Sequence, residues 1–429
     1  MQRVRRRSIV AATLASACVG APRRARAADG AAPDAARPFD AARAWAEWVD
    51  LLTLDYAYFE RPGVNGPAIV AAFAPLAAAL ATRAEFIALL QQMARNFADP
   101  HLQVGPGAPD GPSLVPTASD LHAQARDGRC VIGDVRADSD AVRQGVLVGD
   151  VVLAIDGVAP AAAVQRWLGQ PPGELSRVQL AHGFDIALAG VRERPRLLVL
   201  EGRSGRRTVQ LRSAGEQARA LAAAPALSHE RRGDVGLIRL HNSLGRNDTI
   251  AMFAEAVRSL IDTRALLIDL RNTPSGGNST VARGVLGHFV ARERPYQVHT
   301  VPGEARRHGV PRKFVEYVLP LQPRYRARAV VLAGRWTGSM GEGMVIGFDA
   351  IGVQTAGAPM GRLLGALFHE TLVESGAQVE LGEEQLFHVD GAPREAFVPR
   401  LHVEPAEAGP HGDPTLEAAL RWLSRDGAR

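Results

Sequence analysis

Three patterns of apolar and polar positions follow one another along the chain. Over residues 39–58 and 68–97 apolar residues recur every three or four positions, which is the spacing of amphipathic helices. From residue 121 to 211 the apolar runs are short, and pairs such as Asp156-Gly157 separate them as tight turns. From residue 235 onward apolar runs alternate with stretches of helical spacing. The sequence therefore predicts a helical region, a small domain of short strands and a larger α/β domain.

The third pattern favours a mixed α/β sheet with buried central strands. Its apolar runs predict strands at residues 235–240, 265–270 and 329–333, and the intervening stretches predict helices at 249–261, 281–290 and 342–350. Short apolar runs at 130–132, 151–155, 197–201 and 208–211 predict strands of the small domain. Residues 213–227 are rich in alanine and charge, which indicates a linker or a connecting helix.

The first 27 residues have the pattern of an export signal. Four arginines among the first seven residues precede an apolar stretch at 9–19, and Ala25-Arg26-Ala27 fits a small-x-small cleavage site. The apolar stretch is too short to span a bilayer. Arg6-Arg7-Ser8-Ile9-Val10 resembles a twin-arginine signal. We expect an exported bacterial protein, periplasmic or secreted; the alternative is a disordered basic arm.

Charge and cysteine content change once these residues are removed. Seven arginines and no acid lie in residues 1–27, so the net charge of +5 becomes −2 and no longer favours a nucleic-acid partner. Cys130 would be the remaining cysteine, so no internal disulfide is expected. Ala15-Ser16-Ala17-Cys18 is a weak lipobox, because a larger aliphatic residue is expected in place of Ala15. Membrane association is expected only if Cys18 is lipidated.

Ser339 is the first candidate for chemistry. An apolar strand leads into Thr337-Gly338-Ser339-Met340-Gly341-Glu342, and a helical pattern follows. Such a strand-to-helix turn projects the hydroxyl, and the helix N-terminus would stabilise a developing oxyanion. The alternative is a turn serine that caps the helix.

Two parts of the chain resemble known domains. Residues 121–214 resemble a bacterial, circularly permuted PDZ domain, on the stretch Asp140 to Gly157. Residues 235–405 resemble the core of the tail-specific, or C-terminal processing, serine peptidases, on Asp269-Leu270-Arg271, the loop Pro274-Ser275-Gly276-Gly277 and the Ser339 motif. The resemblance implies an α/β fold: a mixed α/β peptidase core of crotonase-like ββα units at 215–429, a helical region at 28–120 and an inserted PDZ-like β domain at 121–214.

The general base distinguishes two branches of this family. One branch uses a Ser–Lys dyad, with the lysine about 25 residues after the serine. Residues 355–365 contain no lysine, Arg362 cannot accept a proton near neutral pH, and Lys313 precedes Ser339. The tricorn-like branch uses a histidine just before the PDZ domain, where this chain has Asp99-Pro100-His101-Leu102. His101 is therefore the expected base; the alternative is a histidine that caps the preceding helix.

The acid that would orient His101 is less well defined by the sequence. In the tricorn-like branch it lies in a Glu-x-x-Gly-Val-x-Pro-Asp context, which Glu395-Ala396-Phe397-Val398-Pro399-Arg400 matches in part. The glycine is missing, and Arg400 replaces the aspartate. Glu395 is the candidate acid, with Asp390, Glu383 and Glu384 as rivals.

Backbone amides are the candidate oxyanion donors. In the family the glycine loop faces the serine, so the amides of Gly276 or Gly277 and of Met340 are expected to bind the oxyanion; the alternative for the glycines is a tight turn. Asp269 and Arg271 favour a structural pair at a strand end, and Glu342 could bind its own helix start. The remaining histidines lack metal-ligand spacing, so neither a metal nor another cofactor is expected.

The resemblance implies an exported serine endopeptidase. His101 would take the Ser339 proton, Ser339 would form an acyl-enzyme, and Glu395 would orient the imidazole. The PDZ-like domain would bind the C-terminal tail of a protein or peptide substrate by strand addition, or gate the site. The alternatives are a catalytically inactive relative that binds peptides or an apolar ligand, and an esterase that uses the same serine.

Overall fold

The computed structural model describes residues 38–108, 110–169, 173–242, 244–405 and 412–425. The expected export signal and Cys18 lie outside these residues and stay predictions. Among the helices of the described residues, none is long and apolar enough to cross a membrane.

The N-terminal region contains three helices, α1 (Ala41–Leu54), α2 (Gly66–Ala78) and α3 (Arg83–Arg95), and a short hairpin of β1 (Glu60–Arg61) and β2 (Val64–Asn65). Residues 68–97 are mostly helical, as expected, but the helix is interrupted between α2 and α3, where the Thr82 hydroxyl caps a new helix by accepting the Glu85 amide at 3.3 Å. Helix α1 also ends before residue 58, so the chain beyond Asp55 is not helical. Fully buried aromatic rings, among them Trp48, Phe73 and Phe86, hold the three helices together.

The second part, which we call the five-stranded domain, spans residues 121–211. Its sheet has the order β4-β5-β6-β7-β8 and confirms the four strands expected from the sequence. The strands are β4 (Leu121–Arg126), β5 (Arg129–Val135), β6 (Val151–Ile155), β7 (Arg196–Gly202) and β8 (Gly205–Leu211). The helices are α4 (Asp140–Arg143), α5 (Pro160–Leu168) and α6 (Arg177–Ala189). Helix α7 (Ala214–Ala223) then connects this domain to the core.

Helix α6 lies beside the edge strand of this sheet. The Asp185 carboxylate of α6 accepts the Ala123 amide of β4 at 2.7 Å, so the helix takes one of the amides on the free side of that strand. The sequence did not indicate this helix, whose apolar residues do not follow a clear one-sided pattern.

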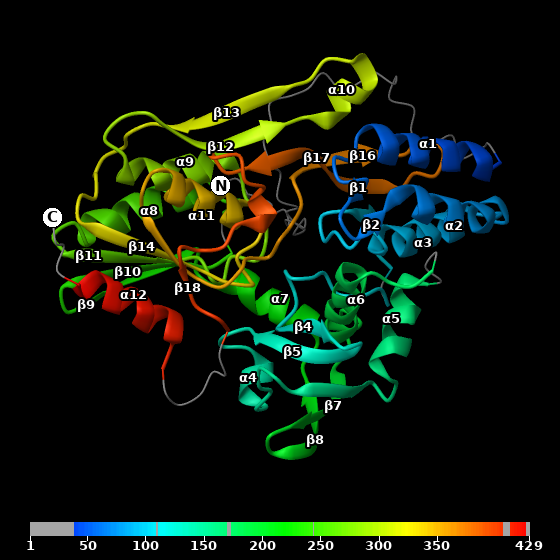
Figure 1. Cartoon of the computed structure of the whole chain (residues 1–429), viewed down its shortest axis with the longest axis horizontal. Helices are drawn as coiled ribbons and strands as arrows, with labels where there is room; N and C mark the ends of the chain where they lie inside the picture. The colour runs from blue at the N-terminus through cyan, green and yellow to red at the C-terminus, as the bar shows by residue number, and fades with distance from the viewer. Residues whose placement is uncertain (1–37, 109, 170–172, 243, 406–411, 426–429) are drawn as a thin grey trace, which may run out of the picture.

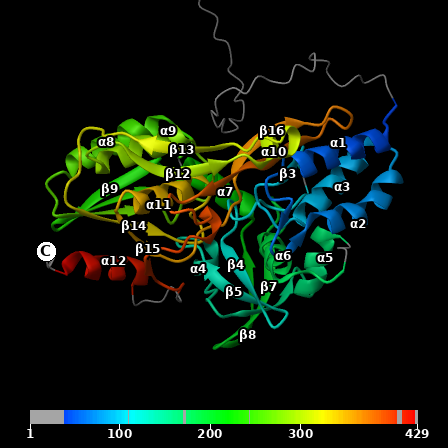
Figure 2. The ribbon, with the colours of Figure 1, turned by 45° about the horizontal axis from the view of Figure 1, so that its top comes forward.

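The core is a six-stranded sheet in the order β18-β15-β14-β11-β10-β9, with β9 antiparallel and the others parallel. Its strands are β9 (Leu227–Arg232), β10 (Val235–Leu240), β11 (Ala265–Asp269), β14 (Arg328–Ala333), β15 (Gln354–Gly357) and β18 (Leu401–His402). Helices α8 (Asp248–Ser259), α9 (Ser279–Leu286) and α11 (Met340–Ala350) cover one face, and α12 (Pro414–Ser424) covers the other (Figures 1 and 2). The alternation of strands and helices expected from the sequence is thereby confirmed.

A second sheet lies beyond these helices. It has the order β13-β12-β17-β16, formed by β12 (Arg294–Thr300), β13 (Lys313–Val318), β16 (Ala366–Thr371) and β17 (Gln378–Phe387), with α10 (Pro302–His308) between β12 and β13 (Figure 1). Strand β3 (Gln103–Gly105) of the N-terminal region pairs with β17. This pairing brings the segment before β3, which carries His101, into the core.

A buried ion pair between Arg196 and Asp120 links the two ends of the five-stranded domain. The Arg196 guanidinium is 1% exposed and donates to both oxygens of Asp120, which is fully buried, at 2.7 and 3.2 Å. It also donates to the carbonyl of Arg212 at 2.9 Å, so it joins the residue directly before β4 to the residue directly after β8.

Asp120→Ala would leave this guanidinium buried without its counter-charge. We expect the free energy of unfolding to fall by about 3–5 kcal/mol, measured by urea unfolding followed by circular dichroism. Glu193→Ala, which breaks the exposed pair with Arg219, is the control and should cost less than about 1 kcal/mol. Equal losses in the two variants would contradict the importance given to the buried pair.

Candidate active site

Ser339 lies in a strained turn between β14 and α11. Its backbone has φ 52° and ψ −116°, in the left-handed half of conformational space that residues other than glycine rarely adopt. The turn places Ser339 directly before Met340, the first residue of the helix, with Ser339 partly exposed. The strand-to-helix turn expected from the sequence is therefore present, and its serine has the strained backbone typical of a functional position.

The glycine loop after β11 packs against this turn. The Gly338 amide donates to the Thr273 carbonyl at 3.0 Å. A Cβ at Gly338 or at Gly341 would lie 2.7 Å from an atom of Pro274 or Thr273, so both positions require glycine. A Cβ at Gly276 would lie 3.6 Å from the Ser339 hydroxyl oxygen. Gly276 therefore borders the hydroxyl.

Gly277 faces a different neighbour. A Cβ there would lie 2.4 Å from the Leu244 side chain, so this residue packs under the loop that follows β10. Of the two glycines, Gly276 is the one with a close approach to the Ser339 hydroxyl.

The Glu342 carboxylate holds the serine turn. Glu342 is fully buried and accepts three backbone amides, those of Ser339 at 2.9 Å, Arg362 at 2.8 Å and Leu363 at 3.1 Å. Burial raises the pKa of this carboxyl, while Arg394 and the three amides oppose that increase. The carboxylate thereby ties the turn to the segment at residues 362–365.

Arg394 binds backbone carbonyls of the same two segments, the serine turn and residues 362–365. Its guanidinium is 1% exposed and donates to the carbonyls of Ser339 at 3.3 Å, Leu363 at 2.7 Å and Gly365 at 3.1 Å. Sequence reasoning missed this residue, because an arginine that is buried through backbone contacts carries no local pattern.

His101 lies against the segment at 362–365. Its Nδ1 is 2.9 Å from the Leu364 carbonyl oxygen, so a hydrogen on Nδ1 leaves the lone pair of the neutral ring on Nε2. Burial, with a smaller contribution from Arg394, lowers the pKa of this imidazole to about 4. No hydrogen bond joins the ring to the Ser339 hydroxyl among the described residues. The structure thus brings both residues to one segment of chain, without a direct bond between them.

Asp99 fixes the backbone of His101. Its carboxylate accepts the His101 amide at 2.9 Å and the Tyr56 hydroxyl at 2.8 Å. Burial raises the pKa of Asp99 to about 6. The Asp-Pro-His motif therefore supplies a carboxylate that binds the histidine backbone, and the Tyr56 hydroxyl donates to that carboxylate.

Among the candidate acids, Glu395 is the one with a buried oxygen that has no partner. It lies in a short 3₁₀ turn at Arg394–Ala396, and its Oε2 has no hydrogen bond among the described residues. The rivals Glu384 and Asp390 bind other histidines, Glu384 the Nδ1 of His299 at 2.7 Å and Asp390 the Nδ1 of His388 at 2.9 Å.

Other motif residues serve the scaffold. Arg400 donates to Asp349 at 2.8 Å, so the arginine that replaces the expected aspartate binds the far end of α11. Asp269 and Arg271 form an ion pair at 2.8 Å, and Arg271 also binds Asp413 at the start of α12. In the part of the chain that the structure describes, no three His, Cys, Asp or Glu side chains gather as a metal site requires.

The five-stranded domain contacts both loops of the site. Arg136 donates to the Asn272 side chain at 2.7 Å, and the Trp336 indole donates to the Ser119 carbonyl at 2.9 Å. Arg335 donates to Asp185 of α6 at 3.0 Å. The glycine loop and the serine turn are therefore both held from this domain.

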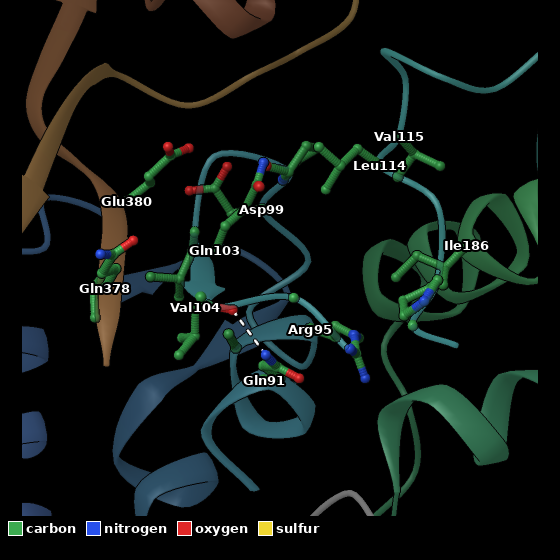
Figure 3. A pocket seen from close by; sticks show the side chains of 18 of the residues that line it. Gln91, Arg95, Asp99, Gln103, Val104, Leu114, Val115, Ile186, Gln378 and Glu380 are labelled. Carbon is green, nitrogen blue, oxygen red and sulfur yellow. Dashed lines mark hydrogen bonds between the residues drawn. The ribbon is translucent and has the colours of Figure 1, made fainter. Parts of the chain in front are cut away.

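A cavity of about 460 Å³ lies next to the His101 segment, between α3, α6, β3 and β17. Its lining includes Asp99 and Gln103, and Figure 3 shows Arg95 and Ile186 on one side with Gln378 and Glu380 on the other. Ser339 and His101 themselves do not line it. Its volume falls within the range of small-ligand sites.

Comparisons with known proteins support the fold. No protein-family model matches the chain, and a search of curated proteins finds no match. Among solved structures, the photosystem II D1 C-terminal processing protease has a TM-score of 0.56 at 16% identity, over 90% of this chain and 98% of that one. Mature CPAF has a TM-score of 0.56 at 14% identity, over 89% of this chain and 96% of that one.

The chain shares the fold of these two proteases. This confirms the mixed α/β fold expected from the sequence. The crotonase-like units, the PDZ-like nature of the five-stranded domain and the roles of the individual residues stay predictions.

Glu342→Gln tests how the turn is held. In the variant, the glutamine NH₂ group would face a backbone N–H that donates to a carboxylate oxygen in the wild type. At least one buried donor would therefore lose its acceptor. We expect the free energy of unfolding to fall by about 1–3 kcal/mol in urea. Glu255→Gln, on the exposed side of α8, is the control and should change the midpoint little. An unchanged midpoint for Glu342→Gln would refute this account of the turn.

The His101 ring should stay neutral well below neutral pH. Its folded pKa of about 4 lies below the unfolded value of 6.5, so the unfolded chain binds the proton first. This contribution to stability is complete above pH 6.5 and is lost as the pH falls toward 4, by about 3 kcal/mol. His101→Asn keeps a donor for Leu364 and should lack this pH-dependent loss.

Nitrogen-15 NMR of histidine-labelled protein measures the titration directly, and urea unfolding at each pH measures the stability. A His101 signal that titrates near 6.5 would contradict the buried, neutral ring.

Proposed function

We propose that this chain is a serine endopeptidase that works through an acyl-enzyme. The observation that carries the proposal is the arrangement of Ser339: a strained turn before α11, bordered by Gly276 and tied through Glu342 to the segment that holds the His101 ring. The fold shared with two proteases supports it.

In the proposed reaction, Nε2 of His101 accepts the Ser339 proton while the serine oxygen bonds to the carbonyl carbon of the substrate. The amide of Gly276 or Gly277 and that of Met340 would donate to the oxyanion. The C–N bond then breaks, and the imidazolium gives its proton to the departing amine. Water, activated by the same ring, releases the acyl group. Glu395 would stabilise the imidazolium.

Two observations favour histidine over lysine as the base. Residues 355–365 contain no lysine, and arginine does not lose its proton near neutral pH. The carbonyl of Leu364, within that segment, instead accepts a hydrogen bond from His101 at 2.9 Å. A histidine base is what the resemblance to the tricorn-like branch implies.

Tail recognition is part of the proposal. PDZ domains add the C-terminal end of a peptide to the edge of their sheet, and β4 is an edge strand of the five-stranded domain. The Ala123 amide of β4 already donates to Asp185. A tail that adds at this position must therefore displace the Asp185 carboxylate or bind along another part of the strand.

A second candidate function has its own support. The Ser339 hydroxyl and the His101 ring share no hydrogen bond among the described residues, and His101 is only 3% exposed. Both features would suit an inactive relative that binds peptides.

A fluorophosphonate probe distinguishes the two candidates. Ser339 should attack the phosphorus with loss of fluoride, giving a phosphonylated serine that mass spectrometry locates. Ser339→Ala should show no labelling, and His101→Ala should react about 10²–10⁴-fold more slowly. Peptides with free and with amidated C-termini, hydrolysed by the same preparation, measure tail recognition.

Folded protein that is not labelled at any pH between about 5 and 9 would refute the peptidase and favour the inactive relative. Equal hydrolysis of the free and amidated peptides would refute tail recognition alone. Labelling with hydrolysis of esters but not of peptides would identify an esterase.

A further inference from the structure

Two of the five tyrosines in the chain stand at positions 56 and 58, directly after α1. Both rings are buried, at 0% and 4% exposure, with their centroids 6.2 Å apart. The Ala57 amide between them donates to the Gly382 carbonyl at 2.9 Å, and the Gln385 side chain donates to the Ala57 carbonyl at 3.1 Å. Strand β17 thus fixes this tyrosine pair beside the candidate site.

The role of Tyr56 is explicit in the structure. Its hydroxyl donates to Asp99, and Asp99 accepts the His101 amide. This tyrosine supports an acid, and the acid holds the backbone of the histidine.

Tyr58 approaches the histidine from the other side. Gly365 has φ 70°, and a Cβ there would lie 2.9 Å from Cε2 of Tyr58. The ring therefore packs directly on this glycine. The carbonyl of Gly365 accepts Arg394, and the carbonyl of the preceding Leu364 binds His101. Tyr58, Arg394 and His101 all meet at the Leu364–Gly365 peptide.

Two buried oxygens near this peptide have no hydrogen-bond partner. They are the Tyr58 hydroxyl and Oε2 of Glu395, the residue that follows Arg394. Burial raises the pKa of Tyr58 far above its usual value, and the Glu395 carboxylate raises it further, while the Leu386 amide opposes the change. The phenol is therefore always protonated and is a donor without an acceptor, within electrostatic reach of a carboxylate that has an oxygen without a donor.

Leaving both groups unpaired would cost about 1–3 kcal/mol for each. A hydrogen bond between them, direct or through one water, removes both costs. Nε of Arg394 is a further buried donor without a partner among the described residues of the site, while Tyr56 and Asp99 are already bound to each other.

We infer that Tyr58 is a positioning residue: its hydroxyl donates to Glu395 and fixes that carboxylate beside the Leu364–Gly365 peptide on which His101 lies. The two tyrosines then have similar roles. Tyr56 positions the His101 backbone through Asp99, and Tyr58 positions the carboxylate of Glu395 for the His101 ring. The catalytic consequence of this inference rests on the proposed function. The hydrogen bond between Tyr58 and Glu395 does not depend on it.

A double-mutant cycle of Tyr58→Phe and Glu395→Ala tests the contact without any assay of activity. Removing an unpaired buried hydroxyl leaves stability unchanged or raises it, whereas removing a bonded one lowers it. We expect Tyr58→Phe to lower the urea midpoint, and the double variant to lower it by less than the two single losses together. A higher midpoint for Tyr58→Phe, or strictly additive losses, would overturn the inference.

The kinetics of fluorophosphonate labelling test the positioning role in the same four proteins. Tyr58→Phe should lower the limiting labelling rate about tenfold without changing the half-saturating probe concentration. Adding Tyr58→Phe to Glu395→Ala should lower the labelling rate little further. Tyr325→Phe, which removes a buried hydroxyl bonded to Thr263 elsewhere in the core, is the control and should label like the wild type.

The two readouts separate the possible failures. Wild-type protein that is not labelled refutes the proposed function, and the urea cycle still decides whether Tyr58 binds Glu395. Wild-type protein that is labelled, with rates for Tyr58→Phe equal to those of the Tyr325→Phe control, refutes the positioning role.

Discussion

The candidate site depends on the three hydrogen bonds that the buried Glu342 carboxylate accepts. One bond fixes the amide of Ser339, which holds a strained backbone, and two fix the amides of Arg362 and Leu363. An isolated carboxylate in the protein interior is strongly unfavourable, so its presence requires donors and a counter-charge. Arg394 provides that charge and also binds the carbonyls of the same two segments. This pair adds to the bond from the Gly361 amide to the Thr337 carbonyl, at 2.8 Å, in tying the turn to the segment beside His101.

The five-stranded domain adds a second constraint on the same loops. Arg136 reaches the glycine loop at Asn272, and Arg335, four residues before Ser339, reaches Asp185. Burial alone would raise the pKa of Asp185, but His122, Arg335 and the Ala123 amide hold it at about 2. One ionised carboxylate therefore serves both the edge strand of this domain and the segment that leads to Ser339.

The sequence predicted those parts of the molecule whose signal is local. Alternating strands and helices, the turn around Ser339 and the Asp-Pro-His segment all follow from spacing and small residues within a short window. The tyrosine pair was assigned to a helix because α1 carries a regular apolar pattern up to that point. Its actual role depends on Asp99 and on Gly365, and the latter lies about three hundred residues away.

Arg394 and α6 could not be predicted from the sequence either, because their contacts also join distant parts of the chain. Arg394 binds backbone carbonyls, which any sequence provides, so nothing near it in the chain indicates burial. Helix α6 is buried on several sides, against β4 and the N-terminal region, and so lacks the one-sided pattern that marks a surface helix.

The electrostatics of His101 explain why such an acid matters. Desolvation and Arg394 keep the ring neutral, which makes it ready to accept a proton but a weak base. In the proposed reaction, the imidazolium would lie in the same buried place, near the same guanidinium, and would need a carboxylate with free hydrogen-bonding capacity. Both Glu342 oxygens are occupied by backbone amides, and Asp99 is bound to the His101 amide and to Tyr56. Glu395 has an oxygen without a partner, so it can stabilise the charged ring if a donor such as Tyr58 holds it in place.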